Sequence, residues 1–188
     1  MALKKGDMET NFEIRTFDAD ISDEEFAKLP KHNLYIILDN LRSAFNVGSI
    51  FRICDTMRVA GLFLCGYTAY PPHTKLDKTS LGTIPYVPWK HFDTTLEAVE
   101  HAKSLGLEVW AAETTSHSIN YSKMDIPKGG VALILGNEAL GVEEEVINEC
   151  DKLVEIPTFG YKNSLNVATA CSVLGFSILE KMGALNEQ

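Results

Sequence analysis

The chain has 188 residues, of which 45% are apolar and 23% charged, and its formal net charge is −9. This length and composition predict one soluble domain with its own hydrophobic core. No apolar run comes near the roughly 20 residues that a membrane span needs, and the N-terminus lacks the apolar stretch of a secretory signal, so we expect a cytoplasmic protein without a membrane partner. The negative charge argues weakly against nucleic acid, because RNA is held largely by lysine and arginine.

The first predicted elements lead from an appendage into a core. Residues 1–30 are expected to form a short appendage and residues 31–188 a single domain. In the appendage, a capping box of Ser22 and Glu25 begins a short helix that ends near Leu29. The continuous apolar run over 34–38 predicts a strand buried on both faces. A polar loop then leads to a helix over 46–57, where apolar side chains recur at three- and four-residue steps.

The later elements continue the alternation of strands and helices. A second strand is predicted over 62–65, followed by a long loop over 66–88. A capping box of Thr94 and Glu97 begins a helix that Gly106 ends. Further strands are predicted over 107–112, 131–135 and 153–156, with a short helix around Val146 before the last of them and a final helix over 164–182.

This alternation predicts an α/β fold with a parallel sheet flanked by helices. Ligands of such sheets lie in the loops that follow the carboxyl ends of the strands. Here these loops are residues 39–45, 112–118, 136–141 and 157–163. We therefore expect the functional site among these four loops.

Several familiar kinds of site are not indicated. The cysteines lie in apolar runs without a C-x-x-C spacing, so we expect small buried thiols rather than metal or redox ligands. They are Cys54, Cys65, Cys150 and Cys171. The dinucleotide fingerprint G-x-G-x-x-G and the P-loop are both absent, which excludes the two commonest nucleotide-binding patterns of an α/β chain.

The first motif begins at Asn46 and ends at Arg52, at the start of the helix over 46–57. An asparagine N-cap followed by a solvated arginine is one interpretation. The other is an anion site, because the N–H groups of a helix start and a planar guanidinium both suit a phosphate. The pattern alone leaves both open.

The second motif, Leu-Gly-Asn-Glu-Ala-Leu-Gly over 135–141, follows a predicted strand. It is compatible with an ordinary turn that places an acid at a helix N-terminus. The alternative is a ligand site, because Gly136 has no side chain and lets a ligand approach the backbone closely.

The third motif runs from Ile156 to Val167. In the structural interpretation, Ser164 caps the last helix. That helix has almost no polar face, which predicts burial on several sides. A deep core position and a subunit interface both satisfy this requirement.

Together and in this order, the three motifs resemble those of the SpoU/TrmH branch of the SPOUT RNA methyltransferases. The resemblance covers about residues 34–179 and rests on Asn-x-Gly-x-x-x-Arg, Leu-Gly-Asn-Glu-x-x-Gly and Ile-Pro…Ser-Leu-Asn-Val. It implies a parallel sheet with a C-terminal deep trefoil knot, and an obligate homodimer. It also implies transfer of a methyl group from S-adenosylmethionine, without a metal, to a ribose 2′-hydroxyl of tRNA or rRNA.

Carried over by position, the resemblance implies two sets of site residues. The expected cofactor-binding residues are Ala112, Glu113, Thr114, Gly136, Asn137, Ile156 and Leu165. The expected catalytic residues are Asn46, Arg52, Glu138, Ser164 and Asn166. Within the family Arg52 matches an essential arginine that is often assigned as the base. A guanidinium is almost never neutral, so we expect Arg52 to clamp a phosphate and the developing alkoxide.

Two other classes of function are weighed against this one. A non-catalytic RNA-binding or assembly factor would keep the fold, and the intact catalytic set argues against it. A small-molecule α/β enzyme would use another nucleotide, and the missing glycine loops argue against that. The loop of residues 68–84, with Lys75 and Lys78, is a candidate for reading RNA but too irregular to interpret. Since family members often carry a separate RNA-binding domain, a partner protein is another source of RNA affinity.

Overall fold

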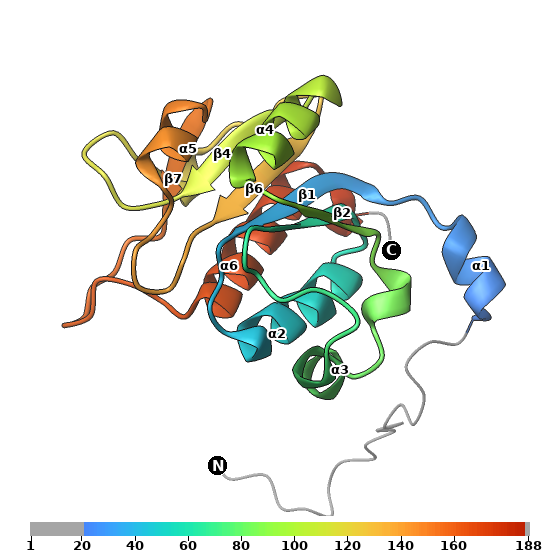
Figure 1. The fold of residues 1–188 in the computed structure, drawn as a ribbon. Coiled ribbons are helices and arrows are strands. Elements are labelled where there is room, and N and C mark those ends of the chain that lie inside the picture. The colour runs from blue at the N-terminus through green and yellow to red at the C-terminus, as the bar shows by residue number, and fades with distance from the viewer. Residues whose placement is uncertain (1–20, 187–188) are drawn as a thin grey trace, which may run out of the picture.

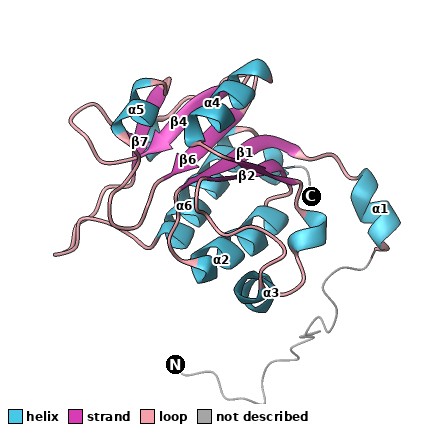
Figure 2. Ribbon diagram, viewed as in Figure 1, coloured by secondary structure: helices cyan, strands magenta, loops and turns pink. Residues whose placement is uncertain are grey.

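A sheet of seven parallel strands organises residues 21–186, the part of the chain that the computed structural model describes (Figures 1 and 2). Its order is β3-β2-β1-β6-β4-β7-β5, and every neighbouring pair is parallel. The strands are β1 His32–Asp39, β2 Val59–Cys65, β3 Trp89–Phe92, β4 Glu108–Ala112, β5 Ile119–Asn120, β6 Val131–Leu135 and β7 Lys152–Glu155. The predicted α/β class with a parallel sheet is confirmed.

Helices cover both faces of this sheet. They are α1 Asp23–Lys28, α2 Ala44–Thr56, α3 Thr74–Ser80, α4 Thr95–Ser104, α5 Glu144–Asn148 and α6 Val167–Lys181, with 3-10 turns η1 Ile84–Tyr86, η2 Tyr121–Lys123 and η3 Ala184–Asn186. One hydrophobic cluster joins α2, α3 and α6 to one face, and a second joins α4 and α5 to the other. Figure 1 shows these two helical layers with the sheet between them.

The two clusters follow from the alternation of side chains along the strands. In β1, Leu34 and Ile36 belong to the cluster with α2 and α6, whereas Ile37 belongs to the cluster with α4. All three are fully buried. The uninterrupted apolar run that predicted this strand is thus explained by a helix layer on each side.

The described end of the N-terminal appendage is a short capped helix. Ser22 and Glu25 form the predicted capping box at the start of α1, where the Ser22 hydroxyl accepts from the Glu25 N–H. Residues 1–20, most of the predicted appendage, lie outside the described residues. Between residues 21 and 186, no helix combines the length and the apolar character needed to cross a membrane.

The predicted long loop over 66–88 is wrong, because it contains α3 and η1, and the edge strand β3 that follows it was missed. Helix α3 has seven residues and buries only Leu76 and Ser80. Two buried positions are too few to show the helical periodicity of apolar residues in the sequence. Strand β3 is short, and Trp89 and Lys90 are both exposed on it. The two-residue strand β5 was missed for the same reason of length.

The cysteines agree with the expectation of buried thiols, with one partial exception. Cys54, Cys65 and Cys171 are buried, whereas Cys150 is half-buried, and all four are free. Burial raises the pKa of Cys65 and of Cys150 to about 12. Neither thiol is therefore a nucleophile near neutral pH.

The order of the strands places β1 beside β6, although four other strands lie between them in the sequence. Such a reversal of strand order creates a crevice at the carboxyl edge of a parallel sheet. All seven strands end at this edge, and the loops that follow four neighbouring strands, β1, β6, β4 and β7, meet there (Figure 1).

Candidate active site

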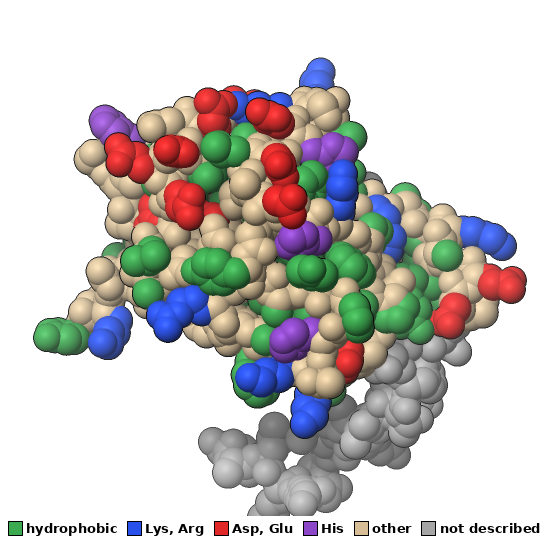
Figure 3. Space-filling view, viewed as in Figure 1, with side chains coloured by type: hydrophobic (Ala, Val, Ile, Leu, Met, Phe, Trp, Pro, Cys, Tyr) green, Lys and Arg blue, Asp and Glu red, His purple; other side chains and the backbone are tan. Residues whose placement is uncertain are grey.

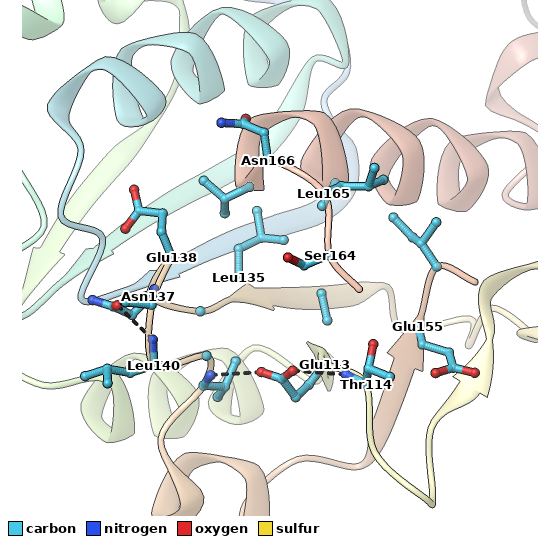
Figure 4. A pocket seen from close by; sticks show the side chains of 18 of the residues that line it. Glu113, Thr114, Leu135, Asn137, Glu138, Leu140, Glu155, Ser164, Leu165 and Asn166 are labelled. Carbon is cyan, nitrogen blue, oxygen red and sulfur yellow. Dashed lines mark hydrogen bonds between the residues drawn. The ribbon is translucent and has the colours of Figure 1, made fainter. Parts of the chain in front are cut away.

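A cavity of about 1240 Å³ opens at this carboxyl edge (Figure 4). It is lined by eleven of the twelve site residues expected from the sequence, which come from the start of α2, the end of β4 and the loops after β4, β6 and β7. They are Asn46, Ala112, Glu113, Thr114, Gly136, Asn137, Glu138, Ile156, Ser164, Leu165 and Asn166. Residues that are far apart in the chain are therefore neighbours in space.

A chain of hydrogen bonds joins one polar residue from each motif. The Asn166 amide donates to the side-chain oxygen of Asn46 over 3.1 Å, and the Asn46 amide donates to the Glu138 carboxylate over 2.9 Å. The same carboxylate accepts the backbone N–H groups of Arg42 and Ser43 at 2.9 and 3.2 Å. The chain therefore connects the start of α6, the start of α2 and the loop after β6.

The capping interpretation of the first and third motifs, which gave Asn46 and Ser164 as N-caps, is not what the structure shows. Ser43, not Asn46, caps α2, and its hydroxyl accepts from the Asn46 N–H. Asn166, not Ser164, caps α6, and its side-chain oxygen accepts from the N–H groups of Ala168 and Thr169. The side chain of Asn46 is therefore available to bridge Glu138 and Asn166, and exposed Ser164 lies on the cavity wall without a capping role.

The Glu138 carboxylate is held in its charged form. Burial of this group acts to raise its pKa, but the hydrogen bonds from the Arg42 N–H, the Asn46 amide and the Ser43 N–H outweigh that effect. The pKa of Glu138 therefore lies below its ordinary value. Near neutral pH the residue is a fixed negative charge and an acceptor, not a proton donor.

Gly136 and Asn137 shape the loop after β6 from within. A side chain at Gly136 would collide with the backbone of Gly141 and Val142, so the turn itself already requires a glycine at this position. The Asn137 amide donates to the Asn40 carbonyl over 2.7 Å and to the Tyr67 hydroxyl over 2.6 Å. Its side chain is thus used inside the protein, and Asn137 holds the cavity wall in shape.

Glu113 connects two loops on the other side of the cavity. Its carboxylate accepts the Thr114 N–H over 3.0 Å and the Val142 N–H over 3.1 Å. These bonds, drawn in Figure 4, hold the loop after β4 against the loop after β6. A carboxylate has about four lone-pair positions, so Glu113 keeps the capacity to accept further hydrogen bonds from a ligand.

Arg52 is the one expected site residue that does not line this cavity. It is exposed on α2, six residues after Asn46, which places it roughly 9 Å further along the helix axis and on another side of the helix. Arg42 lines the cavity instead. Sequence reasoning missed Arg42 as a site residue, although its charge and its place directly after β1 were a usable signal.

The cavity combines apolar and acceptor groups. Side chains of Val154, Ile156, Leu165 and Leu174 supply apolar surface, and three carboxylates, of Glu113, Glu138 and Glu155, lie on its wall. A ligand with a flat apolar part, several hydroxyls and a positive charge suits this lining. Within residues 21–186, no group of three or more His, Cys, Asp or Glu side chains is placed to hold a metal ion.

Comparisons with known proteins agree on one family. The model of the SpoU rRNA Methylase family matches residues 33–176. A tRNA (guanosine(18)-2′-O)-methyltransferase of Aquifex aeolicus is 29% identical over 76% of this chain and 66% of its own length. A relative in Staphylococcus saprophyticus, provisionally named a TrmH family tRNA/rRNA methyltransferase, is 27% identical over 94% of this chain and 70% of that protein.

Solved structures give the same result for the fold. The AdoMet-bound rRNA methyltransferase of Sinorhizobium meliloti superposes with a TM-score of 0.75 at 27% identity, over 80% of this chain and 57% of the other. The TrmH/SpoU tRNA modifying enzyme of A. aeolicus has a TM-score of 0.73 at 24% identity, over 83% and 79%. The chain thus spans little more than half of the Sinorhizobium chain and about two thirds of the two curated relatives.

Proposed function

Because this chain belongs to the SpoU rRNA Methylase family, we propose that it transfers the methyl group of S-adenosylmethionine to a ribose 2′-hydroxyl of a tRNA or rRNA. The observation that carries the proposal is the hydrogen-bonded chain Asn166–Asn46–Glu138, which brings the three motifs together at one cavity. The named reaction of the Aquifex relative and the ligand of the Sinorhizobium structure support the same class.

The lining of the cavity suits S-adenosylmethionine. The cavity is somewhat larger than typical small-molecule sites, which run from about 300 to 1,000 Å³, so it has room for the cofactor and for part of a second ligand. Apolar Ile156 and Leu165 and the backbone at Ala112 and Gly136 would hold the adenosine, and Glu113 and Thr114 would meet its hydroxyls. When bound, S-adenosylmethionine supplies a methyl group on a positively charged sulfur that is already a good leaving group.

The protein then has to align the ribose oxygen and stabilise the charge that develops on it. Ionised Glu138 orients the Asn46 amide, and Asn166 fixes that amide from the other side. Ser164 shapes the wall on which the ribose would lie. Arg52 is exposed and outside the cavity of its own chain, so we assign it to clamping the RNA, with the RNA phosphate assisting removal of the hydroxyl proton.

We also propose the homodimer and the trefoil knot that the resemblance implies, one domain over residues 31–188, and a cytoplasmic location. An exposed stripe on α6 supports the dimer: Val173 is half-buried and Phe176 is 40% exposed, three residues apart on one face. On α2, Phe45 is 55% exposed and lies on the same side of the helix as Arg52. A second copy that covers these two faces would bury both phenylalanines and bring its own surface close to Arg52.

A non-catalytic RNA-binding or assembly factor is the second candidate. The position of Arg52 outside the cavity is the observation that favours it, because a complete catalytic set within one chain would include this residue. The two candidates predict the same cofactor binding and differ in the transfer step.

Transfer of labelled methyl from S-adenosylmethionine to separate pools of unmodified tRNA and rRNA tests the proposal. We expect label in one pool, mapped to a ribose, lost in Arg52→Ala and strongly reduced in Arg52→Lys, which keeps the charge but loses the planar fork. Near-full activity of Arg52→Lys would contradict the clamp. Label in neither pool, from protein that binds S-adenosylmethionine, would contradict the enzyme and favour the assembly factor.

A further inference from the structure

A second hollow lies apart from the cavity, between α3, η1 and β3. We call it the α3 groove; its volume is about 510 Å³. Its lining is three prolines, one tryptophan, one isoleucine and three small or polar residues: Pro71, Pro72, Asp77, Ser80, Gly82, Ile84, Pro85 and Trp89. None of these residues lines the first cavity, so the groove is a separate feature.

One polar group in this groove has no partner. Ser80 is fully buried, and its hydroxyl makes no hydrogen bond to any described residue. Among residues 21–186 it is the one buried side-chain nitrogen or oxygen in this condition. An unsatisfied buried hydroxyl costs folding free energy, so a ligand that hydrogen-bonds to it would remove a penalty that the free protein carries. Asp77 lies three residues earlier, on the same face of α3.

The groove also offers a flat aromatic surface. Trp89 is 37% exposed at the edge of the sheet, whereas Trp110, the other tryptophan, is fully buried. An exposed indole beside proline rings is a stacking surface for a planar group. Unpaired nucleic-acid bases are read in this way, by stacking on aromatic side chains and hydrogen bonding at their edges.

The charge of the surroundings suits a polyanion. Residues 31–92 hold seven lysines and arginines against three acids, whereas residues 93–155 hold four against thirteen. Figure 3 shows acidic side chains gathered over α4 and α5, and basic side chains with a histidine over α3. Lys75 and Lys78, three residues apart, share another, exposed face of α3, and among the described residues neither forms an ion pair.

The polypeptide segment that starts at Tyr67 links the wall of the cavity to the α3 groove. Tyr67, which accepts the hydrogen bond of Asn137 on the cavity wall, begins the segment that leads to Pro71 and Pro72 in the groove. Tyr70 in this segment stacks on His91 with ring centroids 4.1 Å apart. Helix α3 in turn packs on α2, where a side chain at Gly48 would collide with Thr79. An RNA strand laid over α2 and α3 would therefore contact both sites.

We propose that the α3 groove binds an unpaired base of the RNA substrate, stacked on Trp89 and hydrogen-bonded to Ser80 and Asp77. A carboxylate accepts only, so Asp77 disfavours uracil, whose single ring N–H is flanked by two carbonyl oxygens that the carboxylate would repel. Guanine is the best fit, because its ring N–H and its amino group lie side by side and a carboxylate can accept from both. The inference rests on the proposed function for the identity of the ligand, and its test does not depend on catalysis.

The test is a fluorescence titration with single-stranded RNA. Trp89 is the exposed tryptophan, so a base stacked on it quenches emission that buried Trp110 does not lose. The probes are hexauridylate and three hexamers in which one central uridine is replaced by guanosine, adenosine or cytidine. We expect the strongest quenching and the tightest binding with guanosine, and the weakest with hexauridylate.

Three substitutions locate the binding in the groove. We expect Trp89→Ala, followed by the anisotropy of a labelled guanosine hexamer, to weaken binding about tenfold, in line with the loss of one base stack. Ser80→Ala and Asp77→Asn should weaken it several-fold and reduce the preference for guanosine, and Ser80→Ala should not lower the melting temperature of the free protein. Ser104→Ala, at an exposed serine of α4 on the acidic side, is the matched control and should change nothing.

The results of the titration and of the substitutions either support or overturn binding of a base in the α3 groove. Absence of quenching in the wild type, or unchanged affinity in Ser80→Ala and Asp77→Asn, overturns the groove; these two variants decide if Trp89→Ala does not fold. If the same protein methylates RNA, the proposed function stands while the groove fails. Guanosine-dependent quenching without methyl transfer supports the groove and contradicts the enzyme. Quenching by a proline-rich peptide and not by RNA would assign the groove to a protein ligand and overturn the inference.

Discussion

The two halves of the sheet share one architecture and differ in charge. The half with β3, β2 and β1 belongs to residues 31–92, where basic side chains exceed acidic ones by four, and the half with β6, β4 and β7 belongs to residues 93–155, where acidic side chains exceed basic ones by nine. The whole net charge of −9 can thus be assigned to one half. A net charge averaged over the chain is therefore a poor guide to what a protein binds, because a ligand meets one face at a time.

The cavity lies at the junction of these two halves. The basic half supplies Arg42, Ser43 and Asn46, and the acidic half supplies Glu113 and Glu138. This division suits a positively charged cofactor on the acidic side and a polyanionic substrate on the basic side. Four changes test that division, in order of decreasing expected effect.

The largest effect is expected at the residue that joins the halves. Asn46→Ala removes both the bond to Glu138 and the bond to Asn166. We expect methyl transfer to fall about 100-fold, because the reacting groups lose their alignment, while the affinity for S-adenosylmethionine, measured by calorimetry, stays within about threefold of wild type.

Ser49→Ala is the matched control for Asn46→Ala. Ser49 lies one turn further along α2, and its hydroxyl donates to the Phe45 carbonyl in the helix, outside the cavity. It should keep wild-type transfer. Equal losses of transfer and of cofactor affinity in Asn46→Ala would show that Asn46 supports the cavity as a whole and does not join the halves specifically.

A smaller effect is expected from a change within the acidic half. Gly136→Ala places a methyl group against the backbone of Gly141 and Val142. Overpacking of this kind costs about 1–3 kcal/mol of unfolding free energy, which urea denaturation would measure, and it should weaken cofactor binding. At Gly160 an added side chain meets no atom within 4 Å, so Gly160→Ala should unfold like wild type. A stable Gly136→Ala protein would mean that the loop after β6 moves aside easily.

The basic half is tested by the salt dependence of RNA binding. Replacement of both Lys75 and Lys78 by glutamine should lower the magnitude of the slope of log Kd against log salt by about two, one for each lost phosphate contact. Cofactor affinity should not change. The same double change at Lys123 and Lys128, in the acidic half, is the control. Equal slopes for the two double variants would remove the distinction between the halves.

The smallest effect is expected at an ion pair of the acidic half. The Lys152 ammonium lies 2.9 Å from the Glu108 carboxylate and lowers its pKa. Both side chains are about one third exposed, so Glu108→Gln should cost less than about 1 kcal/mol at pH 7. Since the folded pKa is depressed, the contribution exists above the unfolded pKa of about 4.3 and is lost as the pH falls through the folded value. The gap between the urea midpoints of variant and wild type should therefore narrow as the pH falls below about 4 and through the folded pKa; a constant gap would point to another cause.

Sequence patterns predicted the long elements and failed on the short ones. The buried strand β1 and the helix α2 carry enough apolar residues to show their period. Helix α3 and strand β3 have seven and four residues, and packing against α2 and β2 holds them in place. Because that packing is made by residues distant in the sequence, no local sequence pattern predicts these two elements. The α3 groove could not be predicted from the sequence for the same reason.

The candidate site was predicted residue by residue only through the resemblance. Periodicity alone placed the four loops at one edge of the sheet, which the structure bears out. It could not choose the cap of α2, because Ser43 and Asn46 are both good N-cap residues and the choice depends on Glu138, more than ninety positions later. The location of Arg52 outside the cavity depends on the rotation of α2, which its burial against the sheet sets.

The pairing of β1 with β6 also fixes the time at which the site can exist during synthesis. The ribosome adds about 5–20 residues per second, and local contacts form while the chain is still short. The basic half can pair β1 with β2 and β3 and pack α2 and α3 as soon as residue 92 has emerged. The central neighbour of β1 arrives only with residues 131–135, and Asn166 later still. The residues of the α3 groove are thus all present early in synthesis, whereas the cavity can close only after most of the chain has been made.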